Sequence, residues 1–288
     1  MPKIGLMISA TDANDVWHDY IQAFKGAITT AGVSYDPKPL HGAGGVDYAT
    51  YKAAAQQLIA DGANVIVTAG NLAAKACKDA AYPPPPNPPI PNPPAIVVAS
   101  AGDLTGLANQ NLTGCTNGQH NMQILQSRIT TMQQLNPTGV VIVGNDTVPP
   151  VQWAMNQIST LIPQMLNNIP AYLVAFRQQS DLQNPPTIRN KINSSLPNPN
   201  TVNVVYVCSD PLLRTHGGNF VTAAHIAPRM NTMHEFCEWH TKHGGDLCYG
   251  PDFMQLFIKA AGFVDHYFLT GTLPAVFNPG VPDCKQCP

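Results

Sequence analysis

The stretch at residues 65–80, VIVTAGNLAAKACKDA, joins a short apolar run directly to an alanine-rich segment with two lysines. Residues 65–67 predict a buried β-strand, because they are β-branched and apolar on both faces. Residues 72–80 predict a helix, in which alanines supply helix propensity and lysines stay solvated. Gly70 and Asn71 lie at the joint, and Asn71 is expected to cap the helix. This arrangement directs the unpaired N–H groups of the first helical turn toward whatever lies above the sheet.

The same alternation of strand and helix runs along the first two thirds of the chain, in two successive α/β series. Helices between short strands indicate βαβ units and mostly parallel sheets. Further strands are expected at residues 3–9, 33–40, 95–99, 139–144, 171–176 and 202–208. Further helices are expected at residues 17–31, 47–62, 123–135, 151–166 and 186–195, with a long helix near the end that Gly271 closes.

Composition excludes several classes of protein. Charged residues make up only 11% of the 288 residues and the formal net charge is −2, so a nucleic-acid-binding surface is not expected. No run approaches the length of a membrane-spanning helix. Seven scattered cysteines suit reduced, buried thiols better than a disulfide framework.

A proline-rich segment, YPPPPNPPIPNPP, occupies residues 82–94. Its nine prolines in thirteen residues forbid helix and favour the polyproline II conformation. We interpret it as a stiff loop between a helix and a strand. The alternative is a ligand for a proline-recognising domain, and the role of residues 83–94 stays open.

Polar side chains follow five of the predicted strands. The carboxyl ends of parallel strands lie along one edge of a sheet, where ligands bind. Each of the segments SATDAND, AGNLAA, SAGDLTG, GNDTVPP and CSDPLLRTHGG, taken alone, is better explained by cap or turn residues. Five of them along one edge predict a binding cleft.

Three phrases in order along the chain, VIVTAGNLAAKACKDA, PAIVVASAGDLTGLANQNLTGCTNG and ILQSRITTMQQLNPTGVVIVGNDTVPPVQ, resemble the ABC-transporter substrate-binding proteins of the tryptophan/tyrosine-type group. The late stretch GGDLCYGPDFMQLFIKAAGFVDHYFLTGTLPA is similar to the closing pattern of that group. The resemblance covers roughly residues 3–277. It implies a type I periplasmic-binding-protein fold, with two doubly wound, Rossmann-like lobes that close by a hinge on an amino acid or a related small organic acid.

The resemblance also implies a set of ligand-binding residues. Asn71, Leu72 and Ala73 would present helix N–H groups to the carboxylate of an amino acid. Thr11, Asp12 and Asp210 are candidates to pair with its ammonium group. The remaining candidates would line the same cleft, with the two aromatic rings as stacking surface: Trp17, Ser100, Ala101, Asn145, Asp146, Ser209 and Tyr249.

The chain departs from that family at three places. No export signal or lipoprotein leader is visible at its start, its end is FNPGVPDCKQCP, and the proline-rich segment replaces a short turn. We therefore expect a periplasmic or cell-surface protein if a leader was removed, and a cytoplasmic one if the chain is native as given.

Two enzymatic readings compete with binding. Cys237 and the histidines His234, His240 and His243 lie close in sequence and suggest a metal site, but the H-E-x-x-H pattern of metalloproteases is absent. TGCTNG is similar to the cysteine turn of aspartate/glutamate racemases, yet Gly70 stands where the second thiol would be required. The terminal CKQC is interpreted as a flexible tail.

We expect an α/β protein of two lobes, residues 1–116 plus 245–288 and residues 117–244, that binds a small polar ligand between them. It would serve an ABC-type uptake system with a permease as partner, without a cofactor, a metal or catalysis. The alternatives are a cytoplasmic enzyme of the same layered fold, racemase-like or metal-dependent, and a cytoplasmic ligand sensor.

Overall fold

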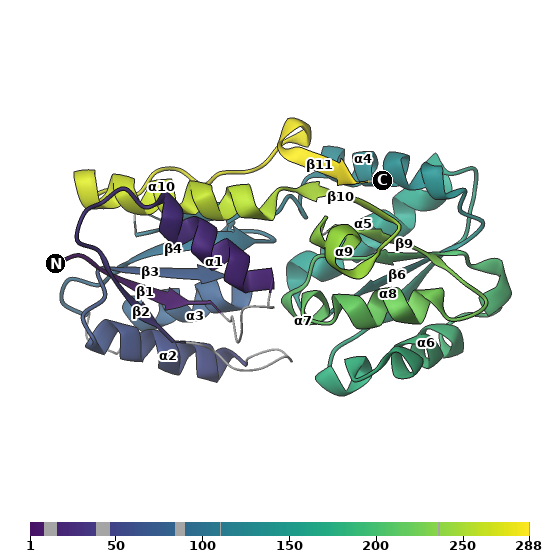
Figure 1. Cartoon of the computed structure of the whole chain (residues 1–288), viewed down its shortest axis with the longest axis horizontal. Coiled ribbons are helices and arrows are strands. Elements are labelled where there is room, and N and C mark those ends of the chain that lie inside the picture. The colour runs from purple at the N-terminus through teal and green to yellow at the C-terminus, as the bar shows by residue number, and fades with distance from the viewer. Residues whose placement is uncertain (9–15, 39–46, 84–89, 110, 236, 288) are drawn as a thin grey trace. The chain divides into compact units, whose positions relative to one another are not determined.

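The computed structural model describes residues 1–8, 16–38, 47–83, 90–109, 111–235 and 237–287 (Figure 1). These residues form two compact units. The first comprises the described residues up to Asn117 together with Phe253–Asn278, and the second comprises Gly118–Asp252 and the segment from Pro279 to the end. The chain therefore leaves the first unit after Asn117, returns to it for the long helix, and leaves it again after Asn278.

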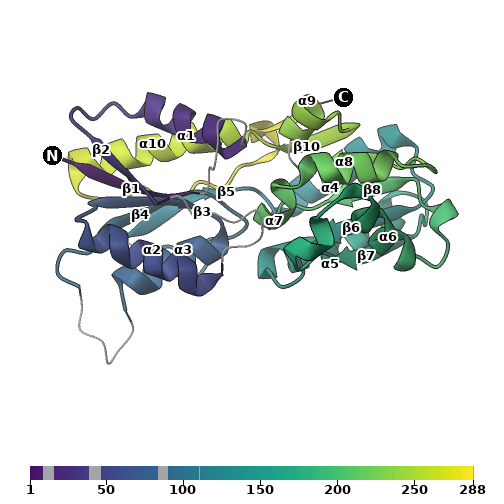
Figure 2. The same cartoon turned by 60° about the horizontal axis from the view of Figure 1, so that its bottom comes forward.

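The first unit is a parallel sheet with helices on both faces. Its strand order is β2-β1-β3-β4-β5. The strands are β1 (Lys3–Met7), β2 (Ser34–Pro37), β3 (Val65–Ala69), β4 (Ala95–Ala101) and β5 (Leu112–Thr116). Helices α2 (Tyr48–Ala60) and α3 (Asn71–Ala81) cover one face, and α1 (Val16–Ala27) and α10 (Phe253–Thr270) cover the other (Figure 2).

The core of this unit follows from its apolar strands. Val65, Ile66 and Val67 of β3 are fully buried, and all seven residues of β4 are buried. These runs are uninterrupted because helices exclude water from both faces of the sheet. The small buried side chains of α3 bring that helix close to the strands: Ala73, Ala74, Ala76 and Cys77.

The C-terminal helix α10 completes this core. Its buried residues recur at helical spacing, as Phe253, Leu256, Phe257, Ala260, Ala261 and Val264. The helix ends where Gly271 adopts a left-handed conformation (φ 73°) and donates its N–H to the carbonyl of Tyr267 at 2.8 Å. Among the described helices, none has the length and apolar character needed to cross a bilayer.

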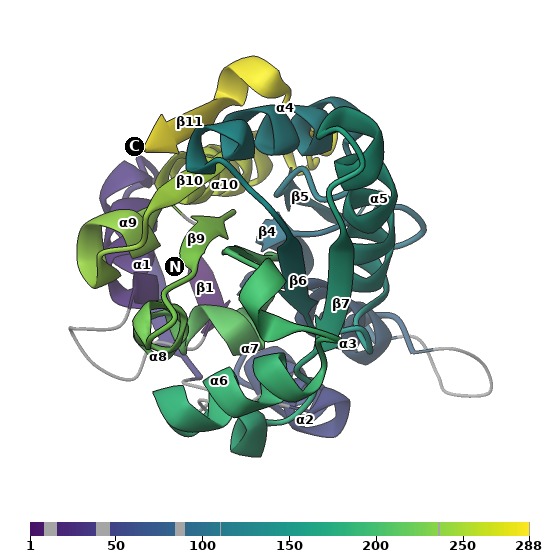
Figure 3. The ribbon, with the colours of Figure 1, turned by 90° about the vertical axis from the view of Figure 1, so that its right-hand side faces the viewer.

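The second unit is a six-stranded sheet of order β11-β10-β9-β8-β6-β7, in which only the β10–β11 pairing is antiparallel. Its strands are β6 (Val140–Gly144), β7 (Ala171–Ala175), β8 (Val204–Val207), β9 (Asn231–His234), β10 (Leu247–Pro251) and β11 (Cys284–Cys287). Helices α4 (Met122–Met132) and α5 (Pro149–Met165) lie on one face, and α6 (Pro185–Ser194) and α8 (Gly217–His225) on the other (Figure 3). The short helices α7 (Pro211–Arg214) and α9 (Glu238–His243) follow β8 and β9.

Most predicted elements are confirmed, with ends that differ by a few residues. The predictions missed the strands β5, β9, β10 and β11, because their sequences LTGCT, NTMH, LCYGP and CKQC contain no long β-branched run. They also missed the helices α7, α8 and α9. The interpretation of CKQC as a flexible tail is wrong, since it pairs along β10. The expected lobe boundary also changes: residues 245–252 and 279–287 belong to the second unit, because β10 and β11 extend its sheet.

The proline-rich segment does connect a helix to a strand. α3 ends at Ala81, β4 begins at Ala95, and the hydroxyl of Tyr82 donates to the carbonyl of Pro94 at 3.2 Å. Residues 84–89, the centre of the segment, lie outside the described residues.

Candidate ligand-binding site

Each sheet contains a topological switch point, where the strand order reverses. In the first unit it lies between β1 and β3, and in the second, whose order β7-β6-β8-β9-β10 repeats the plan, between β6 and β8. In doubly wound folds ligands bind at the carboxyl edge of the sheet near this point. The segments that follow β3, β6 and β8 are those that carry Asn71, Asn145 and Asp210.

At the first switch point, Gly70 turns the chain from β3 into α3. It has φ 91° and ψ 150°, a conformation that side chains disfavour, and its N–H donates to the Ser100 carbonyl at 2.7 Å. Gly70 is therefore the N-cap, and the prediction that Asn71 caps the helix is wrong. Within the described chain, no side chain accepts from the first turn of α3, so its N–H groups offer a site of positive potential.

The Asn71 side chain performs a different task, which is to bind the loop after β4. Its Oδ1 accepts from the N–H of Gly102 at 2.8 Å and of Asp103 at 3.3 Å, and its Nδ2 donates to the Asp103 carbonyl. A single amide thus joins the two loops that flank the edge of β3 and β4. Sequence spacing alone could not reveal this, because the partners lie 31 and 32 residues away.

The other candidates of the first unit differ in access. Leu72 is 45% exposed, whereas Ala73, Ser100 and Ala101 are at most 4% exposed. Only backbone groups of these three could reach a ligand, and the Ser100 and Ala101 carbonyls already accept from Gly70 and Asn117. Thr11 and Asp12 lie outside the described residues, so their predicted role stays a prediction.

At the second switch point, the loop after β6 is held by its own polar residues. Asn145 Oδ1 accepts from the Thr147 N–H at 3.1 Å and hydroxyl at 2.6 Å, which forms a turn before α5. Asp146 forms two hydrogen bonds of 2.6 Å with the Arg177 guanidinium. Arg177 thereby holds the pKa of Asp146 below its usual range, so Asp146 is an anion with a partner.

Asp210, in the loop after β8, differs from Asp146 because it is buried. Its exposed fraction is 2%, and its Oδ1 accepts from the N–H groups of Leu212 at 2.8 Å and Leu213 at 3.2 Å. Burial raises the pKa of Asp210 to about 6, although these two hydrogen bonds lower it. A buried carboxylate at a strand end, with a pKa close to neutrality, is a suitable group to receive a cation.

A buried ionic network supports this loop, and the sequence analysis missed it. Glu235 follows β9 and is fully buried; its carboxylate accepts from the Tyr206 hydroxyl at 2.8 Å and from the Ser209 N–H at 2.9 Å. The guanidinium of Arg128, also fully buried on α4, lies 3.0 Å from Glu235, and its Nε donates to the Tyr249 carbonyl at 3.2 Å. Arg128 lies on the apolar face of the predicted helix 123–135, and a charged residue at such a position could have indicated a buried ion pair.

Ser209 is thus fixed from both of its backbone ends, since its carbonyl accepts from the Gln119 side chain. The two aromatic candidates are packed within their own units. Trp17 is 7% exposed, and its ring lies 5.9 Å from Phe257 and 6.1 Å from Tyr20. Tyr249 packs against the core of the second unit. Trp17 is thus buried, whereas Tyr249 is partly exposed, and their predicted contact with a ligand stays a prediction.

The histidines do not gather into a metal-binding group among the described residues. His234 is fully buried, and burial lowers its pKa to about 3. His240 Nδ1 donates to the Gly245 carbonyl at 2.7 Å. The one group of His, Cys, Asp and Glu side chains that lies close enough to share an ion in the described chain consists of Cys237, Cys248 and Cys287.

The expectation of reduced cysteines throughout is wrong, because Cys237 and Cys248 form a disulfide with Cα atoms 5.1 Å apart. The remaining thiols are free, and Cys77, Cys115 and Cys208 are buried. Burial raises the pKa of Cys115, the thiol of the racemase-like turn, to about 12. A thiol with such a pKa stays protonated near neutral pH and cannot take up a substrate proton, which weakens the racemase alternative.

Comparison with known proteins identifies the fold. No family model matches the sequence, and no curated protein matches it. A solved structure described as an ABC domain in complex with L-Trp from Streptococcus pneumonia has a TM-score of 0.75 at 13% identity, covering 99% of this chain and 90% of that one. A structure described as an ABC sugar transporter subunit from Rhodobacter sphaeroides has a TM-score of 0.67 at 14% identity, covering 99% of this chain and 97% of that one. A structure described as a LacI transcriptional regulator from Bacteroides fragilis has a TM-score of 0.69 at 8% identity, covering 99% of this chain and 96% of that one.

These likenesses establish the fold class: α/β, with parallel sheets in two lobes, similar to type I periplasmic binding proteins. The neighbours named are ABC solute-binding proteins and a regulator of the same fold, and their descriptions name L-Trp and sugar. At these identities the ligand of this chain is not given by its neighbours, so it must be argued from the residues at the two switch points.

Proposed function

We propose that this protein is the substrate-binding component of an ABC-type uptake system and that its ligand is an amino acid or a related small organic acid. Support comes from each unit taken by itself. In the first unit, the first-turn N–H groups of α3 have no side-chain acceptor among the described residues and suit an anion. In the second unit, buried Asp210 suits a cation. An α-amino acid has one group of each kind, whereas a sugar carries neither charge.

The observation that carries the proposal is Asp210. Asp210 is 2% exposed, none of the ion pairs among the described residues involves its carboxylate, and burial raises its pKa to about 6. Its ionised form therefore lowers stability. Such a group is expected where a ligand supplies the missing charge. In contrast, Asp146 at the same sheet edge already has Arg177.

The location we propose is the periplasm or the cell surface. The Cys237–Cys248 disulfide supports this, since disulfides persist in oxidising compartments and are rare in the cytosol. A cytoplasmic ligand sensor with the fold of the LacI-type regulator is the alternative, and a disulfide disfavours it. We propose a permease partner only because the proposed function in an ABC-type uptake system requires one.

The test is calorimetric titration with L-tryptophan, L-leucine and the uncharged sugar alcohol allitol near pH 6, in two buffers of different ionisation enthalpy. Pairing with an ammonium group lowers the pKa of Asp210, so amino-acid binding should release up to about half a proton at that pH. Native mass spectrometry of the protein as purified would first show whether a ligand is retained.

Asp210→Asn should abolish proton release and weaken amino-acid binding tenfold or more, about 1.4 kcal/mol. Asp61→Asn, at the C-terminal end of α2, is the control and should leave both unchanged. Binding of allitol with no response to amino acids, or amino-acid binding that Asp210→Asn leaves unchanged, would refute the proposed ligand class.

A further inference from the structure

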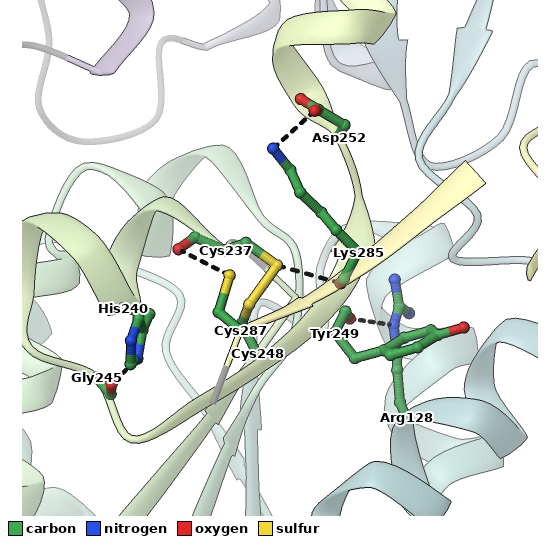
Figure 4. The surroundings of a disulfide bond; sticks show 9 residues. All are labelled: Arg128, Cys237, His240, Gly245, Cys248, Tyr249, Asp252, Lys285 and Cys287. Carbon is green, nitrogen blue, oxygen red and sulfur yellow. Dashed lines mark hydrogen bonds and ion pairs between the residues drawn. A yellow bond between two sulfur atoms is a disulfide. The ribbon is translucent and has the colours of Figure 1, made fainter. Parts of the chain in front are cut away.

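Three sulfur atoms of the second unit lie together. Cys237 precedes α9, Cys248 lies in β10, and Cys287 lies in β11; their Sγ atoms are all within 4.8 Å of one another. Two of them form the disulfide, and Cys287 is a free thiol (Figure 4). Cys237 and Cys248 are buried, whereas Cys287 is partly exposed.

The pairing of β10 with β11 brings Cys287 to this place. Cys287 is directly opposite Cys248 in the antiparallel register, and Cys284 is opposite Pro251. Directly opposed residues in antiparallel strands have Cα atoms about 4.5–5.5 Å apart, which lies within the range that a disulfide requires. Cys248 therefore has two cysteines at bonding range, Cys237 and Cys287.

The same register separates the two cysteines of the CKQC sequence. Residues three apart in a strand face opposite sides of the sheet. Accordingly, Cys287 approaches Cys237, whereas the charge of Arg128 acts on Cys284. These two cysteines are thus not a C-x-x-C redox pair, and the reactive partner of Cys287 must come from elsewhere in the fold.

Further contacts hold β11 against the disulfide. Cys237 Sγ lies 3.4 Å from the Lys285 carbonyl oxygen, and Cys287 Sγ lies 4.0 Å from the Cys237 carbonyl oxygen. Lys285 Nζ pairs with Asp252 at 2.6 Å, just after β10 (Figure 4). The thiol is therefore positioned by backbone pairing, an ion pair and sulfur contacts together.

We propose that Cys237, Cys248 and Cys287 form an internal thiol–disulfide exchange site. The Cys287 thiolate attacks Cys248 Sγ, a Cys248–Cys287 bond forms, the Cys237–Cys248 bond breaks, and Cys237 leaves as a thiolate that takes up a proton. One disulfide and one thiol are present before and after, so the step needs no external oxidant or reductant. The crosslink moves from the segment before α9 to the C-terminal strand.

The exchange changes which segments of the chain the disulfide connects. The present disulfide joins residues 11 apart, while the exchanged one would join Cys248 to Cys287 across 39 positions and attach β11 to β10. It would also release the segment that leads into α9. Burial raises the pKa of Cys287, as do the charges of Glu238 and Asp252, and Lys285 opposes them; exchange should therefore accelerate as the solution becomes alkaline.

Peptide mapping tests the proposal directly. The purified full chain is incubated without reductant at pH about 8.5, near the ordinary cysteine pKa, and free thiols are trapped with N-ethylmaleimide. Trypsin cleaves after Arg229, Lys242, Lys259 and Lys285, which places Cys237, Cys248, Cys284 and Cys287 on four separate peptides. Mass spectrometry then identifies each crosslink without ambiguity.

The expected result is a mixture of Cys237–Cys248 and Cys248–Cys287 peptides in the wild-type chain. After oxidation with glutathione disulfide, Cys237→Ser should contain only the Cys248–Cys287 crosslink. Cys287→Ser should lose this crosslink entirely, and Cys284→Ser should match the wild type. If Cys237→Ser does not fold, trapping of the wild-type chain still decides.

Finding Cys237–Cys248 as the only crosslink in the wild-type chain at every incubation time would overturn the proposal. So would a purified protein whose three thiols hold one zinc ion by native mass spectrometry, since the sulfurs would then be metal ligands. Ligand binding does not enter this test, so its failure is separate from a failure of the proposed function.

Discussion

Asp210 shows how burial of a single ionisable residue lowers the stability of the folded chain. Its side chain is buried at the end of β8, where its two hydrogen bonds to backbone N–H groups do not compensate the loss of water, so its pKa rises to about 6. Because the folded chain holds this proton more tightly than the unfolded chain, with a pKa near 3.9, stability falls as pH rises from about 4 to 6. Well above pH 6 Asp210 is fully ionised, and the loss of stability reaches its full value.

We predict that Asp210→Asn stabilises the ligand-free protein at pH 7.5 by up to about 3 kcal/mol, two pKa units at 1.36 kcal/mol each. The amide oxygen can still accept from Leu212 and Leu213. Urea unfolding at pH 4, 5, 6 and 7.5 measures the effect, which should shrink toward zero at pH 4. A gain that is equal at all four values would show that the charge of Asp210 is not its cause.

At the scale of elements, the Arg128–Glu235 pair connects parts of the second unit that the strand order alone does not join. Arg128 is on α4, Glu235 follows β9, and the network includes Tyr206 of β8 and the backbone of Ser209. Breaking one partner of such a buried pair leaves an isolated charge, whereas removing both avoids this.

We predict that Glu235→Leu and Arg128→Met each destabilise the protein by about 3–5 kcal/mol, and that the double variant loses less than the sum. Urea unfolding gives all three free energies. Lys191→Met, at the partly exposed Lys191–Asp181 pair, is the control and should cost about 1 kcal/mol or less. Additive losses in the double variant would mean that the two side chains act independently.

At the scale of the whole molecule, the redox conditions around the protein affect its stability, because they decide whether the disulfide is present. The Cys237–Cys248 crosslink closes a short loop of separation 11 in the second unit. The loop-closure relation assigns about 3 kcal/mol to a loop of this size, by restriction of the unfolded chain.

We therefore predict that mild reduction lowers the free energy of unfolding of the second unit by about 3 kcal/mol. Urea unfolding with and without dithiothreitol, followed by hydrogen exchange of β9 and β10, measures this loss. Helices and strands of the first unit, whose cysteines are free, should keep their protection. Equal stability with and without dithiothreitol would contradict this prediction, and the disulfide would then no longer support a periplasmic or cell-surface location.

Much of the fold was predictable because the signals are local. A β-branched run such as residues 65–67, followed by a glycine and an alanine-rich segment, predicts strand, turn and helix within one window of sequence. The polar residues after these strands were predicted as the ligand edge, and the strand orders place Asn71, Asn145 and Asp210 at the switch points. That they bind a ligand stays a proposal.

What the sequence by itself determined is thus the α/β class, the two-unit plan and the strand ends that carry polar groups, since each depends on neighbours along the chain. Only the tertiary structure decided that CKQC is a strand, that Cys237 pairs with Cys248, that Glu235 and Arg128 meet in the core, and that Asn71 binds another loop. The physical reason is the same in all four cases. Each depends on a partner distant in sequence or on burial by other elements. Neither produces a periodic pattern of residues that could be recognised in the sequence.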